Sequence, residues 1–102
     1  MKLVRDEIPE MIRGDGKWCL CRKVKGIDEH MSWLREKIIE ETEEFILDPS
    51  YEEAADMLEV VRTFCGLHDL DFETVVKSAD KKRKDSGGFK KGIILESVGA
   101  DK

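Results

Sequence analysis

Apolar residues recur at helical spacing through the middle of the chain. Within residues 28–47 they lie three, four and seven positions apart, as expected for one face of an α-helix. The members of this stripe are Met31, Leu34, Ile38 and Phe45. Asp28 is a plausible N-cap, and Asp48-Pro49-Ser50 interrupts the pattern after Leu47. The pattern therefore predicts a long helix from about Asp28 to Leu47.

Two further helices are predicted after this break. Ser50 is followed three residues later by Glu53, which is the spacing of a capping box, and apolar residues then recur at helical spacing to about Gly66. A third helix is expected over residues 72–84 with Asp71 as its cap. Because the first two helices are joined by a short break, we expect them to form an antiparallel hairpin.

The two ends of the chain have different patterns. Leu3–Arg13 predicts a loop and a short helix, with Asp6 as its cap and Pro9 in its first turn. Alternating side chains predict a strand over 18–25, and 92–98 predicts a second one that would pair with it. The expected fold class is mainly α: an antiparallel helical hairpin core with a third helix and a small two-stranded β ribbon, in a single domain of 102 residues.

The composition narrows the class of protein. Hydrophobic residues make up 40% of the chain, which is enough for a folded core, and no apolar run approaches the roughly 18 residues of a membrane-spanning helix. A net charge of -5 disfavours general nucleic-acid binding. Three cysteines without a CxxC pair argue against a disulfide framework and fit a reducing cytoplasm.

Acidic residues are placed in register on the two hairpin helices. Glu41 and Glu44 share one helix face, and so do Glu53 and Asp56 on the next helix. If the chain reverses at Asp48-Pro49, the residue numbers of facing positions add up to 97, so that 44 faces 53 and 41 faces 56. Four carboxylates are therefore expected at two adjacent levels of one seam.

The position of Glu41 in the apolar stripe indicates that the seam needs a cation. The apolar stripe of the first helix continues through position 41, where Glu41 stands instead. An unpaired charge against an apolar seam costs several kcal/mol, so a cation must offset it. Oxygen ligands without His or Cys suit a hard ion, Mg²⁺ or Mn²⁺. Glu-rich helices are more often solvated faces, and that alternative stays open.

A basic segment follows the acidic one. Residues 36–59 hold ten acidic residues against Lys37 alone, whereas 77–91 hold seven basic residues against two acidic ones. This asymmetry favours a substrate whose anionic groups contact both the cation and basic side chains, and phosphates fit that description. The apolar row of the third helix leads on to Arg83, which is expected to point inward.

Ordered motifs along nearly the whole chain resemble one known family. Glu40-Glu41-x-x-Glu44 followed by Glu53-x-x-Asp56 resembles the EExxE…ExxD signature of the all-α MazG-like nucleotide pyrophosphohydrolases. Three flanking segments are similar to a small branch described as predicted house-cleaning NTP pyrophosphatases and related to phosphoribosyl-ATP pyrophosphohydrolase. These segments are Lys2-Leu3-Val4-Arg5-Asp6-x-Ile8-Pro9-Glu10, Asp56-Met57-Leu58-Glu59-Val60-Val61 and Lys82-Arg83-Lys84-x-x-Gly87-Gly88-Phe89.

The resemblance implies a homodimer or homotetramer that uses Mg²⁺ to hydrolyse a nucleoside triphosphate to the monophosphate and pyrophosphate. It implies three groups of site residues: the metal ligands Glu41, Glu44, Glu53 and Asp56; the catalytic pair Glu40 and Glu41, with Glu40 orienting or deprotonating water; and the substrate-binding residues Lys37, Arg83 and Lys84. The short loop Leu47–Ser50 and the residue Ser86 depart from the family pattern and leave the nucleotide open.

Two other functions fit the same residues. One keeps the enzyme class but takes phosphoribosyl-ATP as the substrate. The other is a non-catalytic helical module that self-associates or binds a partner, with the acidic residues as a charged face. A true cation site would raise the melting temperature as the metal concentration rises, whereas a mere charged face would not.

Overall fold

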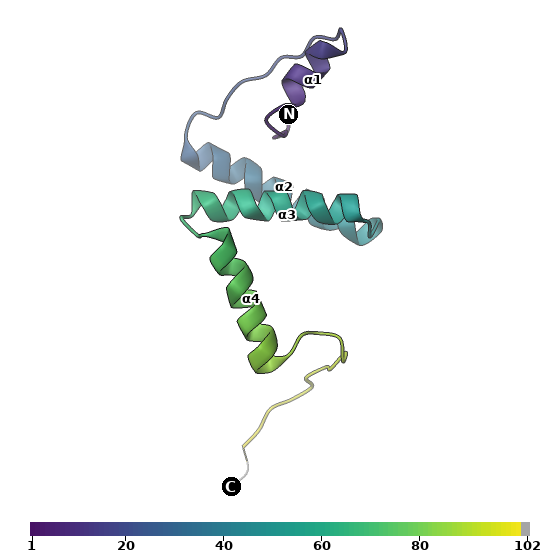
Figure 1. Cartoon of the computed structure of the whole chain (residues 1–102), viewed down its shortest axis with the longest axis vertical. Coiled ribbons are helices and arrows are strands. Elements are labelled where there is room, and N and C mark those ends of the chain that lie inside the picture. The colour runs from purple at the N-terminus through teal and green to yellow at the C-terminus, as the bar shows by residue number, and fades with distance from the viewer. Residues whose placement is uncertain (101–102) are drawn as a thin grey trace. The chain divides into compact units, whose positions relative to one another are not determined.

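The computed structural model describes residues 1–100, which contain four helices (Figure 1): α1 (Ile8–Gly14), α2 (Ile27–Leu47), α3 (Tyr51–Leu67) and α4 (Phe72–Ser86). The mainly α class expected from the sequence is confirmed. The chain divides into two units, Met1–Leu70 and Asp71–Lys102. None of these four helices combines the length and the hydropathy that crossing a bilayer requires.

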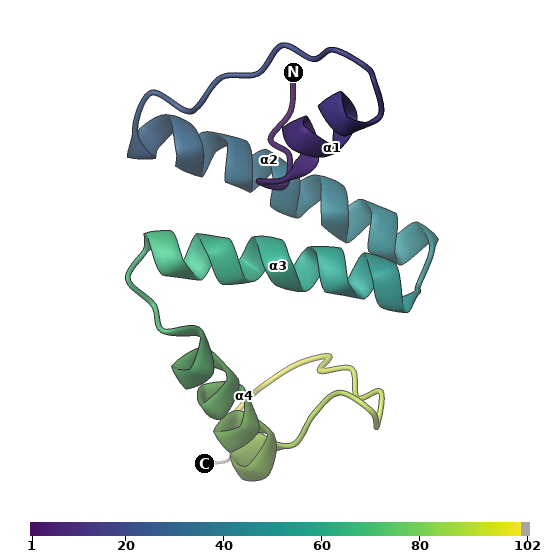
Figure 2. The same cartoon turned by 45° about the horizontal axis from the view of Figure 1, so that its top comes forward.

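The first unit is built on the hairpin of α2 and α3. The two helices run side by side in opposite directions and are joined by residues 48–50 (Figure 2). Leu34 of α2 and Cys65 of α3 are its most buried apolar residues, with 2% and 7% of their surface exposed. Because this apolar core is small, each of its residues contributes a large share of the free energy gained by burying apolar surface.

The predicted N-cap of α3 is present. The Ser50 hydroxyl accepts a hydrogen bond from the Glu53 backbone N–H at 3.2 Å. The Glu53 carboxylate has a buried oxygen, Oε2, without a hydrogen-bond partner. The cap therefore holds the start of α3 and places Glu53 on the helix, while one oxygen of that carboxylate remains free for another ligand.

Replacing Ser50 with Ala is expected to lower the free energy of unfolding by about 1 kcal/mol, since the Glu53 N–H loses its acceptor. Urea unfolding followed by circular dichroism measures the change. Ser32→Ala, at an exposed position inside α2, is the matched control and should cause no loss because Ala favours a helix. Equal stability of the two variants would contradict the role of this cap.

The predicted cap of α2 is wrong. The helix begins at Ile27 after Gly26, so that Asp28 lies inside the first turn and makes no capping hydrogen bond. No side chain caps the helix, and Glu29 of its first turn instead binds the segment that precedes it. Its carboxylate accepts hydrogen bonds from the Lys25 backbone N–H at 2.7 Å and from the Arg22 guanidinium at 2.6 and 3.0 Å. These contacts, the Arg22 bond foremost, hold the pKa of Glu29 well below its usual range.

The predicted cap of α1 is also wrong. Glu7, not Asp6, occupies the N-cap position, and no side chain there accepts a backbone hydrogen bond. Pro9 lies in the first turn as expected, where its missing N–H leaves no helical hydrogen bond unmade. The Arg5 carbonyl accepts a hydrogen bond from the Ile8 N–H at 3.1 Å. The backbone before α1 is thereby tied to the start of the helix.

The predicted β ribbon is absent from residues 1–100. Residues 18–25 and 92–98 both run without regular structure. The apolar side chains that produced the alternating pattern, such as Trp18 and Leu20, are 86% and 92% exposed. A strand needs a partner for its backbone groups and a core for one of its faces. Segment 18–25 has neither within its unit, and alternation alone cannot provide them.

The second unit contains α4 followed by an irregular segment. Asp71 caps the helix as predicted, accepting from the Thr74 N–H at 3.0 Å, and Gly87 ends it with a φ of 86°, which favours glycine. Arg83, expected to point inward, is 72% exposed and lies 3.7 Å from Asp80. The reason is that α4 buries no residue, so its apolar row leads into no core within this unit.

Candidate functional site

Carboxylates from α2 and α3 meet at the seam of the hairpin. Oxygen atoms of Glu41, Glu53 and Asp56 lie within 4.8 Å of one another, and Glu41 forms a second such group with Glu40 and Glu44. The register deduced from the sequence thus brings position 41 to position 56. Glu41 belongs to both groups and is the centre of the acidic cluster, a name used below for Glu41, Glu53 and Asp56.

Two oxygens of the cluster lack partners. Glu41 is 6% exposed, and its Oε2 atom is buried without a hydrogen bond, as is Oε2 of Glu53. A buried carboxylate oxygen without a donor is costly, because it has lost water and gained nothing in exchange. A divalent cation held by oxygen ligands would supply the missing interaction. The donor set therefore fits Mg²⁺ or Mn²⁺.

The electrostatics of Glu41 reflect this setting. Burial, followed by the nearby charge of Glu44, raises the pKa of the Glu41 carboxyl, while Lys37 opposes the change. The Lys37 ammonium lies 3.5 Å from Glu41 Oε1 and 3.6 Å from Glu40 Oε1. One lysine shared between two carboxylates does not neutralise the cluster, so the seam retains negative charge.

The largest departure from the sequence-based expectations is Arg5. Its guanidinium donates a hydrogen bond to Asp56 Oδ1 at 2.7 Å, across 51 positions of the chain. Arg5 was part of the N-terminal motif but was not assigned to the site. The sequence offered one signal: Arg5 is a basic residue in a predicted loop, and the hairpin has a surplus of acidic residues that could pair with it. Only the folded chain shows that the partner is Asp56.

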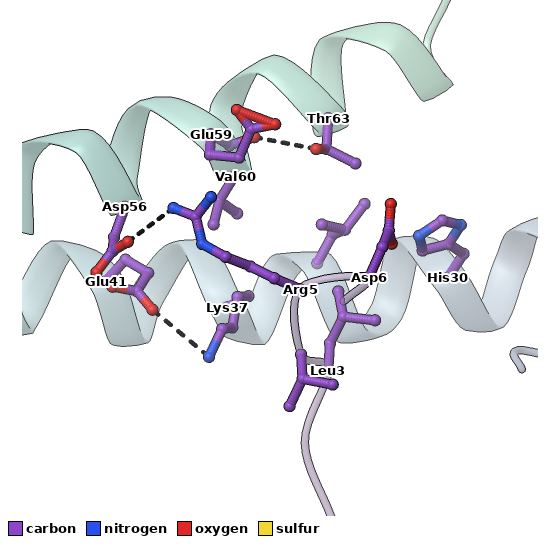
Figure 3. A pocket seen from close by; sticks show the side chains of 12 residues that line it. Leu3, Arg5, Asp6, His30, Lys37, Glu41, Asp56, Glu59, Val60 and Thr63 are labelled. Carbon is purple, nitrogen blue, oxygen red and sulfur yellow. Dashed lines mark hydrogen bonds and ion pairs between the residues drawn. The ribbon is translucent and has the colours of Figure 1, made fainter. Parts of the chain in front are cut away.

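A cavity of about 250 Å³ opens beside the cluster (Figure 3). Its lining includes six charged side chains: Arg5, Asp6, Lys37, Glu41, Asp56 and Glu59. The other lining residues are the apolar Leu3, Val4, Leu34 and Val60 and the polar His30 and Thr63. In Figure 3 Arg5 extends from the N-terminal segment toward the two hairpin helices, with its guanidinium at Asp56. The cavity therefore offers a ligand both charged and apolar side chains.

The remaining predicted residues lie outside this cluster. Glu44 is exposed, although its charge acts on Glu41. Arg83 and Lys84 are exposed and belong to the second unit. The structure thus brings together Glu41, Glu53, Asp56 and Lys37, and it leaves the contribution of Arg83 and Lys84 as a prediction.

Comparisons with protein-family models, with curated proteins and with solved structures gave no match to this chain.

Proposed function

We propose that this protein is a Mg²⁺-dependent nucleoside triphosphate pyrophosphohydrolase, which releases a nucleoside monophosphate and pyrophosphate. The observation that carries the proposal is the buried Glu41, whose Oε2 atom lacks a partner at the centre of a carboxylate cluster beside a cavity. A solvated acidic face would not hold a carboxylate at 6% exposure. The motifs that resemble MazG-like enzymes add the reaction type to this chemistry.

In this proposal Glu41, Glu53 and Asp56 hold the cation, and Glu44 joins them from the adjacent turn. When bound, a divalent cation neutralises phosphate charge and lowers the pKa of water at the site. Glu40 accepts a proton from the attacking water. The water oxygen bonds to one of the two phosphorus atoms of the α–β linkage as the bond from that atom to the bridging oxygen breaks, and the products are the monophosphate and pyrophosphate.

The basic side chains bind the phosphates. Lys37 already lies in the wall of the cavity, and its three donors can exchange a carboxylate for a phosphate oxygen. Arg83 and Lys84 are assigned the same role on the strength of their motif alone. Positioning and charge neutralisation carry the catalysis, because this reaction needs no covalent nucleophile from the protein.

We further propose that the protein works in the cytoplasm as a homodimer or homotetramer. Several apolar side chains of the hairpin helices remain exposed, including Ile39 and Ile46 of α2 and Leu58 of α3, at 59%, 70% and 47%. Burying such a surface against a second copy would extend the small core, which is what obligate oligomers do.

The test is a panel of canonical and modified nucleoside triphosphates together with phosphoribosyl-ATP, each assayed for pyrophosphate release with Mg²⁺ and with a chelator. We expect release from at least one nucleotide that depends on Mg²⁺. The best substrate separates a house-cleaning enzyme from a phosphoribosyl-ATP pyrophosphohydrolase. No release from any member of the panel would overturn the proposal.

Melting curves at rising Mg²⁺ concentration address the non-catalytic alternative. A cation that binds only the folded state raises the melting temperature by mass action, by an amount equivalent to about 2.7 kcal/mol at a hundred times its dissociation constant. A rise in melting temperature with Mg²⁺ but without pyrophosphate release would indicate that the protein binds the cation and is not this enzyme. Absence of both would favour an interaction module with a charged face.

A further inference from the structure

The N-terminal segment places a second cation at the acidic cluster. Arg5 reaches Asp56 at 2.7 Å and also feels the charges of Glu59 and Glu41. Its backbone carbonyl is fixed by the Ile8 N–H at 3.1 Å. With 58% of its side chain exposed, the guanidinium can move while its backbone stays in place. The backbone of Arg5 is therefore fixed, whereas its exposed guanidinium can exchange Asp56 for another partner.

Arg5 and a divalent cation need the same carboxylate. Asp56 is one of the three residues whose oxygens converge, and Oδ1 of this residue is the acceptor of the Arg5 bond. A guanidinium hydrogen bond and a metal ion both draw on the lone pairs of this small group, and their positive charges repel each other. Occupation of Asp56 by one thus weakens its hold on the other.

An Arg5 guanidinium that leaves Asp56 can bind a phosphate group in the cavity. Arg5 lines the same cavity as Lys37, so it would stand over the space in which phosphate groups lie under the proposed function. Guanidinium groups match the oxygens of phosphate as well as those of carboxylate. The group that neutralises Asp56 in the free protein is therefore chemically suited to bind the substrate.

We propose that Arg5 is a substrate-binding residue that is held by Asp56 in the free protein, gives up this carboxylate to the divalent cation, and then binds a phosphate oxygen. This inference rests on the proposed function. It predicts that Arg5→Gln strengthens cation binding and weakens anion binding, because Arg5 competes with the cation for Asp56 but helps to bind the phosphate.

The first measurement is cation binding alone. Arg5→Gln is expected to bind Mn²⁺ about two- to fivefold more tightly than the wild type, measured by electron paramagnetic resonance of free Mn²⁺, since an exposed pair of this kind contributes up to about 1 kcal/mol. Arg35→Gln removes the same charge from an exposed position of α2 and is the matched control. A gain no larger than that of the control, or weaker binding, overturns the proposal.

The second measurement is anion binding with Mg²⁺ saturating. Arg5→Gln is expected to bind inorganic pyrophosphate about tenfold more weakly than the wild type in calorimetric titrations, because a charged hydrogen-bond donor is lost. Arg35→Gln should bind it as the wild type does. Unchanged pyrophosphate affinity in Arg5→Gln would remove the substrate-binding role even if the cation bound more tightly.

These outcomes separate the inference from the proposed function. If the cation and pyrophosphate respond as expected but no nucleotide is hydrolysed, the role of Arg5 as a binding residue stands and the proposed activity falls. If nucleotides are hydrolysed and Arg5→Gln behaves like Arg35→Gln, the activity stands and the inference falls. If neither the wild type nor Arg5→Gln binds Mn²⁺, the inference and the proposed function are both wrong.

Discussion

Replacing Glu41 with Gln is expected to abolish pyrophosphate release while raising the melting temperature of the metal-free protein. Glu41 belongs to both carboxylate groups, so its loss should lower the rate at least about 100-fold, more than changes in residues that only orient metal ligands. The amide removes the negative charge of the one buried residue of the cluster, whose Oε2 atom has no partner, and this favours the folded state. The Mg²⁺-induced rise in melting temperature should disappear as well.

The matched control is Glu43→Gln, which makes the same change at an exposed position of α2 outside the acidic cluster. It should retain both activity and the response to Mg²⁺. A Glu41→Gln protein that turns over nucleotide at the wild-type rate would defeat the assignment of the site. One that is inactive and also less stable than the wild type would show that the buried charge is better compensated than the structure indicates.

The stability difference between wild type and Glu41→Gln should depend on pH. The pKa of Glu41 is raised in the folded state, so folding is destabilised only where the carboxyl must ionise. Burial and the charges of Glu44 and Asp56 raise this pKa, and Lys37 lowers it. The advantage of the variant should be absent below the ordinary value of 4.5, grow as pH rises above it, and level off once pH exceeds the raised pKa. Melting curves with a chelator measure it.

Leu34→Ala is expected to cause the largest loss of stability, about 2–5 kcal/mol. Leu34 is 2% exposed, the most buried residue of the hairpin, and the structure offers few other apolar contacts to compensate. Small domains are stable by only about 5–15 kcal/mol, so this loss is a large fraction of the total. Denaturant midpoints should be compared at several protein concentrations, because an oligomer gains stability with concentration.

Leu47→Ala supplies the comparison for this loss. Leu47 ends α2 and is 85% exposed, so its truncation should change the free energy of unfolding by no more than about 0.5 kcal/mol. Similar costs for the two variants would mean that Leu34 does not form the centre of the core in solution.

Local sequence determined the helices. Helical periodicity located all three long helices, and Ser50 and Asp71 marked two of their starts because a side-chain oxygen followed by helix-forming residues satisfies free N–H groups within one turn. The short break at 48–50 also fixed the register that brings Glu41 to Asp56. These features depend on residues only a few positions apart, so the sequence contains all that is needed to infer them.

Only the tertiary structure decided which groups the acidic side chains contact. The apolar stripe already distinguished Glu41 from the other acidic residues of 36–59, and Glu41 alone among the described charged residues is buried. That its Oε2 atom and that of Glu53 lack partners depends on the packing between the helices, which the sequence pattern does not give. Arg5 reaches Asp56 across 51 positions, a contact that no local pattern encodes. The expected strands failed for the same reason: alternation describes one segment, whereas a strand exists only when another segment of the folded chain pairs with it.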